Sequence, residues 1–315
     1  MQRYLFVHFK EKTTPDGEQV YFALSKDGFN WEEVNNGEPV LWAYYGDKGV
    51  RDFTITRCNN KYYIIATDLS LSYGMRNQYK HSWKEIGENG SKCFSVWESE
   101  DLVNWSEQRL VKIGDEHFGC LWAPDVIYDK ENIDYILHWS SSHDCNNFGD
   151  KGIYYSRTKD FESFTYPACL HRRDGRDIID SAMYEEDGVY YLFVKDGHPT
   201  TIVLLRSNSP TGPCERVEAF DESMKAIEVG LYEAPTAVKL DCGRWALFLD
   251  YYGRPGKEQG YIPFLSDDIA SGVFKRSDES FSFPYGFKHG TILAITEEEY
   301  ERMKNHDWTN IPDRR

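Results

Sequence analysis

The chain has 315 residues, which is long for one compact core but within the range of a single closed all-β fold. Its 52 acidic and 36 basic side chains give a formal charge of −16. This charge argues against a duplex nucleic-acid binder and against a protein that docks on an anionic membrane, because both need cationic surfaces. No apolar run of about 18 residues occurs, so no bilayer-spanning segment is expected.

Two short patterns near the start, RYLFVHF at 3–9 and YFALSKD at 21–27, alternate in the manner of β-strands. The first residues lack an apolar signal-peptide core, so a cytoplasmic location is expected. Seven scattered cysteines without C-x-x-C spacing give neither a zinc site nor a redox dithiol.

A unit of two strands then repeats along the chain. Each unit opens on an acidic or polar residue and continues into an aromatic-rich strand, as in DFTITR followed by KYYIIATD at 61–68. The opening residues are Asp52, Asp125, Asp180, Glu233 and His289, with later spacings of 55, 53 and 56 residues. A third strand follows each pair. This period of short strands predicts an all-β, five-bladed β-propeller.

The ends of the chain complete the expected ring. The last opening strand, HGTILAIT from His289, has no following partner, so the N-terminal strands are expected to complete its blade. The segment TEEEYERMKN at 296–305 predicts a short C-terminal helix with a Thr cap and Glu in its first turn. No linker interrupts the chain, so we expect one domain over 1–315.

The opening strands of a propeller line its central channel, which would gather the opening residues at one mouth. Two carboxyl groups with separated pKa values can protonate a leaving oxygen and deprotonate water, the chemistry of glycoside hydrolysis. Single acids also have simpler explanations. Asp125 in WAPD fits a turn residue, and Asp52 could pair with Arg51. Glu233 lies between Tyr232 and an Ala-Pro pair, a poor place for an idle charge.

The chain resembles glycoside hydrolase family 43 over nearly its whole length. The resemblance rests on five motifs in order: VRD ending at Asp52, WAPDVIYD, Ile179-Asp180 with EEDGVYYLF, YEAP around Glu233, and KHGT around His289. The resemblance implies a five-bladed propeller that hydrolyses with inversion. It implies Asp52 as general base, Asp180 as the modulator of the acid's pKa, and Glu233 as general acid. Phe53 and Ser181 stand where relatives commonly have Pro, which would alter the local backbone.

Other residues are expected around the substrate. Phe53, Trp122, Trp139 and Tyr251 lie near the ends of inner strands, where they could form the walls of a sugar site or pack in the core. His289 could contact substrate, bind channel carboxylates, or approach a structural calcium ion directly or through water, as the resemblance implies. No cofactor is expected for the chemistry itself. His198 could also reach the mouth, although a plain loop histidine is the favoured interpretation.

Three long connections, 69–93, 141–152 and 252–260, are expected to form the rim and to carry specificity. The expected activity is an inverting exo-glycosidase that removes α-L-arabinofuranosyl groups from hemicellulose oligosaccharides such as arabinoxylan. β-D-Xylosidase, galactofuranosidase and exo-galactanase activities remain alternatives on the same fold. A phosphorylase using Arg51, Arg57, Arg172, Arg173 and Arg176, or a non-catalytic sugar binder, would be rivals from other classes. The expected partner is an oligosaccharide; the oligomeric state stays open.

Overall fold

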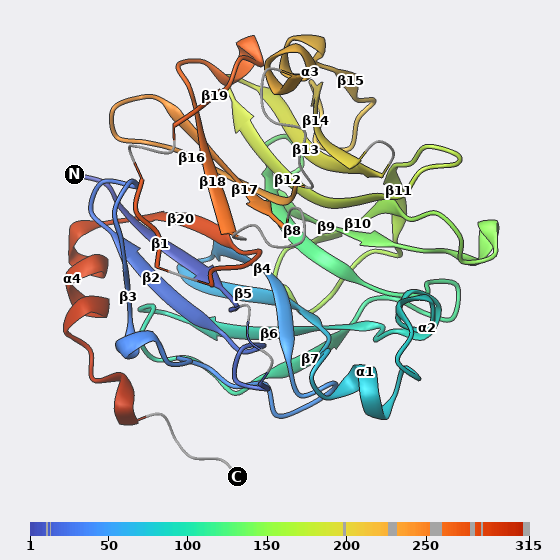
Figure 1. Ribbon diagram of the computed structural model, residues 1–315, viewed down its shortest axis with the longest axis horizontal. Coiled ribbons are helices and arrows are strands. Elements are labelled where there is room, and N and C mark those ends of the chain that lie inside the picture. Colours follow the sequence, from blue (N-terminus) through green and yellow to red (C-terminus); the bar gives the residue numbers. More distant parts are fainter. Residues whose placement is uncertain are drawn as a thin grey trace.

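The computed structural model describes residues 1–10, 12, 14–197, 200–225, 232–252, 260–277, 281–284 and 286–310. Five four-stranded antiparallel sheets are arranged around a central axis, as Figure 1 shows. The predicted five-bladed β-propeller is confirmed. None of the helices in this described part is long and apolar enough to cross a membrane.

Each blade runs from an inner strand to a short outer strand. Blade 1 contains β4 (Val50–Cys58), β5 (Lys61–Asp68), β6 (Cys93–Ser99) and β7 (Arg109–Lys112). Blade 2 contains β8 (Trp122–Asp129), β9 (Asp134–Ser141), β10 (Gly152–Thr158) and β11 (Ala168–His171). Blade 3 contains β12 (Ile178–Glu186), β13 (Val189–Gly197), β14 (Thr200–Ser207) and β15 (Glu215–Arg216). Blade 4 contains β16 (Tyr232–Lys239), β17 (Trp245–Tyr251), β18 (Gly260–Ser266) and β19 (Lys275–Arg276).

Blade 5 joins the two ends of the chain, as predicted. Its inner strand β20 (Thr291–Ile295) pairs with β1 (Arg3–His8), which is followed by β2 (Tyr21–Ser25) and β3 (Trp31–Glu33). At Gly290, just before β20, an added Cβ would lie 1.9 Å from the Val7 carbonyl oxygen. Only glycine therefore allows the C-terminal segment to approach β1 this closely.

A polar turn repeats after the third strand of several blades. The Ser25 hydroxyl accepts the Gly28 N–H at 2.9 Å, while Asp27 accepts the N–H groups of Phe29 and Asn30. The same arrangement recurs from Ser99 in blade 1 and from Thr158 in blade 2. These side chains satisfy backbone donors that the sheet leaves unpaired, which explains the recurring S/T-x-D pattern of the sequence.

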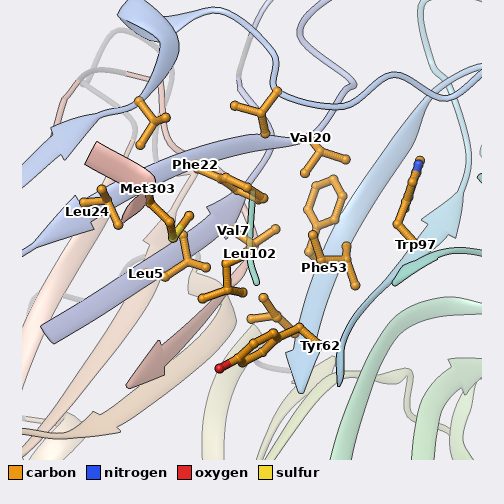
Figure 2. Packing of buried hydrophobic residues seen from close by; sticks show 14 of the residues in the cluster. Leu5, Val7, Val20, Phe22, Leu24, Phe53, Tyr62, Trp97, Leu102 and Met303 are labelled. Carbon is orange, nitrogen blue, oxygen red and sulfur yellow. The ribbon is translucent and has the colours of Figure 1, made fainter. Parts of the chain in front are cut away.

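Apolar side chains from facing blades pack between the sheets. One cluster joins β1 and β2 to β4, β5 and the C-terminal helix α4 (Glu297–Asn305), as Figure 2 shows around Val7, Phe53 and Met303. α4 begins after the threonine cap expected from the sequence, where Thr296 and Glu299 form a reciprocal capping box. The described residues also form three α-helices that were not predicted, namely α1 (Gly74–Asn77), α2 (Trp83–Asn89) and α3 (Glu218–Lys225).

Candidate active site

The inner strands of blades 1 to 4 share a backbone irregularity close to the channel mouth. In each strand the pairing register shifts at a residue with positive φ. These residues are Asp52, Ala123, Asp180 and Ala234, with φ of 51°, 48°, 53° and 53°. A bulge of this kind bends the strand and redirects a side chain, and positive φ is uncommon outside glycine. Asp52 and Asp180 thus occupy equivalent positions, whereas Glu233 lies one residue before its bulge.

Asp52 on β4 lies beside His289, which precedes the inner strand β20 of the neighbouring blade 5. The Asp52 Oδ1 lies 3.3 Å from His289 Nδ1, and 18% of the Asp52 side chain is exposed. Burial would raise the pKa of Asp52, but the hydrogen bond and charge of His289 outweigh it, with smaller contributions from Arg51 and Thr67, so the pKa is lowered. Asp52 is therefore held as a carboxylate.

His289 carries the complementary charge. Burial would lower its pKa, but the hydrogen bond and charge of Asp52, with the charges of Asp180 and Glu233, raise it to about 9. Gly290, the next residue, donates its N–H to the Tyr261 hydroxyl at 3.2 Å and fixes the backbone here. The imidazolium lies among the three acids as their shared counter-ion at neutral pH.

Asp180 lies deeper than Asp52 and contacts the backbone beside Glu233. Its Oδ2 accepts the Ala234 N–H at 3.2 Å, and its own N–H donates to Ser140 Oγ at 2.9 Å. Burial raises the pKa of Asp180, the charge of His289 opposes this, and the charge of Glu233 adds to it. The Asp180 carboxyl thus holds the backbone of Ala234, the residue after Glu233, and its pKa also responds to the like charge of Glu233.

Glu233 is the most open of the three acids, with 29% of its side chain exposed, and Lys195 Nζ lies 2.8 Å from its Oε2. Lys195 comes from β13 of blade 3 and also lies 4.6 Å from the Tyr252 ring centroid. Burial would lower the pKa of Lys195, but the charges of Asp180 and Glu233 raise it. Across the strand pair, Asp250 is the register partner of Glu233 and binds Lys288 at 2.8 Å.

The sequence did not reveal Lys195, Asp250, Lys288 or Thr67 as part of this cluster. A signal was nevertheless present, because Thr67, Lys195 and Asp250 all lie at the polar ends of otherwise apolar second strands, as in KYYIIATD and VYYLFVKD. Alternation inside each strand predicts the strand itself. The polar residue near its end is the additional signal, because it brings the side chain to the mouth.

Asp125 does not join the acids at the mouth, which corrects the sequence interpretation. It lies two residues beyond the bulge at Ala123, and its side chain is buried between blades. Thr54 Oγ1 and the Met183 N–H donate to it at 2.9 and 2.8 Å. Burial raises its pKa to about 6. Asp125 therefore links blades 1, 2 and 3, and is not a turn residue either.

Arg51 forms a close ion pair with Glu18, while its charge also helps to lower the pKa of Asp52. Its Nη1 lies 3.0 Å from Oε1 of the buried Glu18, whose carboxylate also accepts the N–H groups of Leu71 and Ser72. Besides the expected influence of Arg51 on Asp52, its pair with Glu18 thus ties the start of the 69–93 connection to blade 1.

Three of the four aromatic residues expected around the sugar lie in core clusters. Phe53 is 1% exposed in the cluster of Figure 2, and Trp139 is fully buried against Phe94 and Phe118. Core packing, the other placement expected for these residues, is the one that the structure shows for both rings. Tyr251 is also buried and packs on Tyr232.

Trp122, by contrast, is half-buried at the rim. Its ring meets Trp83 of α2 edge to face at 6.2 Å, and Lys151 Nζ lies 5.0 Å from its centroid. The connections 69–93 and 141–152 therefore meet beside the mouth. Of the third predicted rim segment, 253–259 lies outside the described residues, as does His198.

The described residues do not fit a calcium site around His289. No group of three His, Cys, Asp or Glu side chains within this part of the chain is arranged to hold a metal. The His289 Nδ1 is already paired with Asp52 Oδ1 at 3.3 Å. We therefore derive no step through a metal.

Known proteins resemble the chain in sequence and in fold. It is 27% identical over 309 residues to an α-L-arabinofuranosidase from Bifidobacterium longum subsp. longum, covering 86% of this chain and 28% of that protein. A segment of 94 residues is 33% identical to a β-1,2-mannobiose phosphorylase from Thermoanaerobacter sp. (strain X514), covering 29% of this chain and 26% of that one. The chain thus matches about a quarter of the length of each relative.

An exo-1,5-α-L-arabinanase structure from a bovine ruminal metagenomic library superimposes with a TM-score of 0.58 at 16% identity, covering 87% of this chain and 93% of that one. This likeness concerns the fold. The sequence profile of a family described as a probable glycosyl hydrolase domain, related to glycoside hydrolase family 43, matches residues 1–301. The chain belongs to this family of probable glycosyl hydrolase domains.

Proposed function

We propose that the protein is an inverting exo-glycosidase that removes non-reducing α-L-arabinofuranosyl groups from hemicellulose oligosaccharides such as arabinoxylan. The observation that carries this proposal is the grouping of Asp52, Asp180 and Glu233 around the protonated His289 at the channel mouth. The similarity to an α-L-arabinofuranosidase supports the choice of sugar. β-D-Xylosyl, galactofuranosyl and exo-galactan substrates are the alternatives for the same site.

The three acids differ in exposure and partners in a way that fits three roles. Asp52 is a partly exposed carboxylate, suited to accept a proton from water. Glu233 is open to the mouth, where a leaving oxygen can approach it. Asp180 is buried and bonded to the backbone next to Glu233, so we assign it the positioning and charge of the acid rather than a proton transfer.

In the proposed reaction, water attacks the anomeric carbon while the glycosidic C–O bond breaks. Asp52 takes a proton from the attacking water, and Glu233 gives its proton to the leaving oxygen. His289 holds Asp52 ionised at the start and so keeps the base available. Exchange with solvent then returns one proton to Glu233 and removes one from Asp52.

Phosphorolysis is the second candidate, and two observations favour it. A segment of the chain resembles a β-1,2-mannobiose phosphorylase, and two cations, His289 and Lys195, lie among the catalytic acids, where phosphate would need them. The arginines predicted to bind phosphate support this candidate less, because three of them are paired with carboxylates. Arg51 binds Glu18, and Arg173 and Arg176 share the buried Asp196.

One assay separates these candidates. Aryl α-L-arabinofuranoside and aryl β-D-xyloside are compared at equal concentration, each with and without inorganic phosphate. Faster release from the arabinofuranoside, independent of phosphate, supports the proposal. Preference for the xyloside would replace arabinofuranose by xylose as the proposed sugar. Turnover that requires phosphate would assign the chain to the phosphorylases.

A further inference from the structure

Two tryptophans, Trp83 and Trp122, contact each other at the start of the inner strand β8. Trp83 is the first residue of α2 and is 54% exposed, although large apolar side chains are usually buried. It contacts Trp122, the first residue of β8, with ring centroids 6.2 Å apart and planes at 83°. Lys151 Nζ lies 5.0 Å from the Trp122 ring. The Trp83 ring is thus presented to solvent beside the half-buried Trp122 and beside Lys151, whose Nζ also lies 3.5 Å from Asp177 Oδ1.

This surface adjoins the catalytic acids. Trp122 precedes the bulge residue of blade 2, as Glu233 precedes that of blade 4, and both side chains are half-buried at the mouth. The next residue, Ala123, donates its N–H to Thr67 Oγ1 at 2.8 Å, and the Thr67 hydroxyl in turn contacts Asp52. Trp122 is therefore connected to the proposed base through two contacts.

The α2 segment that carries Trp83 is fixed in place. Ser82 caps the helix by accepting the Glu85 N–H, and Ile86 is fully buried against a small cluster that includes Trp122. At the other end of α2, the Gly90 N–H donates to the Gly119 carbonyl at 2.8 Å. Binding at Trp83 would therefore not have to order a loose loop, which favours affinity.

We propose that Trp83 and Trp122 form the subsite for the leaving saccharide, the part of the substrate beyond the cleaved bond. The inference rests on the proposed function, because the cleaved sugar must lie between Asp52 and Glu233 and the rest of the chain must leave over the rim. The occupant is a neutral pyranose chain, a β-1,4-linked xylo-oligosaccharide. Its C–H faces can pack on indole rings, while Lys151 can donate to its hydroxyl groups.

The test compares Trp83→Ala and Trp83→Phe with a matched control, Tyr128→Ala. Tyr128 lies on the same strand as Trp122 but near its far end, is 39% exposed, and packs on another aromatic ring, that of Tyr135. Two substrates are used, arabinosylated xylotetraose and methyl α-L-arabinofuranoside, whose leaving group is too small to reach the rim. Binding of unsubstituted xylotetraose is followed by calorimetry.

Trp83→Ala should raise KM for the arabinosylated xylotetraose about tenfold, corresponding to one stacking contact, and should leave kcat/KM for the methyl glycoside unchanged. Xylotetraose binding should weaken equally, be largely retained in Trp83→Phe, and be unaffected in Tyr128→Ala. Equal KM values and equal binding in wild type and Trp83→Ala would overturn the inference, as would a wild type that does not bind xylotetraose.

Two outcomes separate this inference from the proposed function. A wild type that binds xylotetraose through Trp83 but hydrolyses neither arabinofuranoside would refute the arabinofuranosidase and keep the saccharide site. Concentration-dependent self-association in sedimentation, abolished by Trp83→Ala, together with no effect on xylotetraose binding, would assign this surface to a second copy of the chain and overturn the subsite.

Discussion

Replacing His289 by glutamine should remove a pH-dependent part of the folding free energy. In the native state the pKa of His289 is raised from 6.5 to about 9, so the folded protein holds this proton more tightly than the unfolded chain does. A raised pKa stabilises the fold fully below pH 6.5, and this stabilisation is lost as the pH rises through about 9. Glutamine retains a hydrogen-bond donor for Asp52 but has no titrating charge.

The size of this pH-dependent stabilisation follows from the pKa of His289 in the unfolded chain, 6.5, and in the folded protein, about 9. A change of one in pKa corresponds to about 1.4 kcal/mol, so His289 contributes roughly 3 kcal/mol that disappears over this pH range. The His289 side chain is only 13% exposed, so solvent screening reduces this figure little. Other groups also titrate; burial, for example, raises the pKa of Asp47 to about 7. Groups that His289 does not act on, such as Asp47, titrate equally in both proteins and cancel in the difference.

The assay is urea denaturation of wild type and His289→Gln at pH 6 and pH 9.5. The difference in unfolding free energy between the two proteins should shrink by about 3 kcal/mol from the lower to the higher pH. Parallel pH dependence in the two proteins would refute the reasoning, because His289 would then not be charged in the folded state. A kinetic consequence is also expected: without the imidazolium, burial raises the pKa of Asp52, and the acidic limb of kcat/KM moves to higher pH.

Asp52→Asn should keep the fold and lower turnover by several orders of magnitude, with partial rescue by azide and formation of a glycosyl azide of inverted configuration; normal turnover would move the base to another group. Glu233→Ala should lose far more activity on substrates with poor leaving groups than on activated aryl glycosides, and equal losses would contradict its role as acid. The asparagine of Asp180→Asn can still accept the Ala234 N–H but lacks the negative charge. The basic limb of the pH–rate profile should therefore move to lower pH. An unmoved limb, or rescue of activity by azide, would exclude the role of Asp180 as modulator. Gly290→Ala should lower the unfolding free energy by about 3 kcal/mol or more, measured in urea, because its Cβ meets the Val7 carbonyl; an unchanged midpoint would refute the tight closure of blade 5.

The propeller could be predicted from the sequence because the three innermost strands of each blade are long, apolar and regularly spaced. The closure of blade 5 followed from one strand that lacked a partner, and α4 from its Thr296 cap. The outer strands were missed because they have only two to four residues and are largely exposed, so no alternation marks them. Helices α1 and α2 were missed because they are one or two turns long and are held by packing.

At the site, sequence reasoning brought Asp52, Asp180 and Glu233 to one mouth but misplaced Asp125. The reason is the bulge: an extra residue shifts which side chain faces the channel, and spacing alone does not locate it. Phe53 follows the bulge residue Asp52 and packs between blades, whereas Trp139 lies on the regularly paired β9 and points into the core by simple alternation. Lys195 comes from a neighbouring blade, so its contact with Glu233 depends on how the blades pack.

The most direct test of the account is proton NMR of the first-formed product. Wild type is mixed with an aryl α-L-arabinofuranoside in phosphate-free buffer, and the anomeric signals of released arabinose are followed before mutarotation. The proposed roles of Asp52 and Glu233 predict that β-L-arabinofuranose appears first. Initial appearance of the α-anomer, or no release until phosphate is added, would contradict the account.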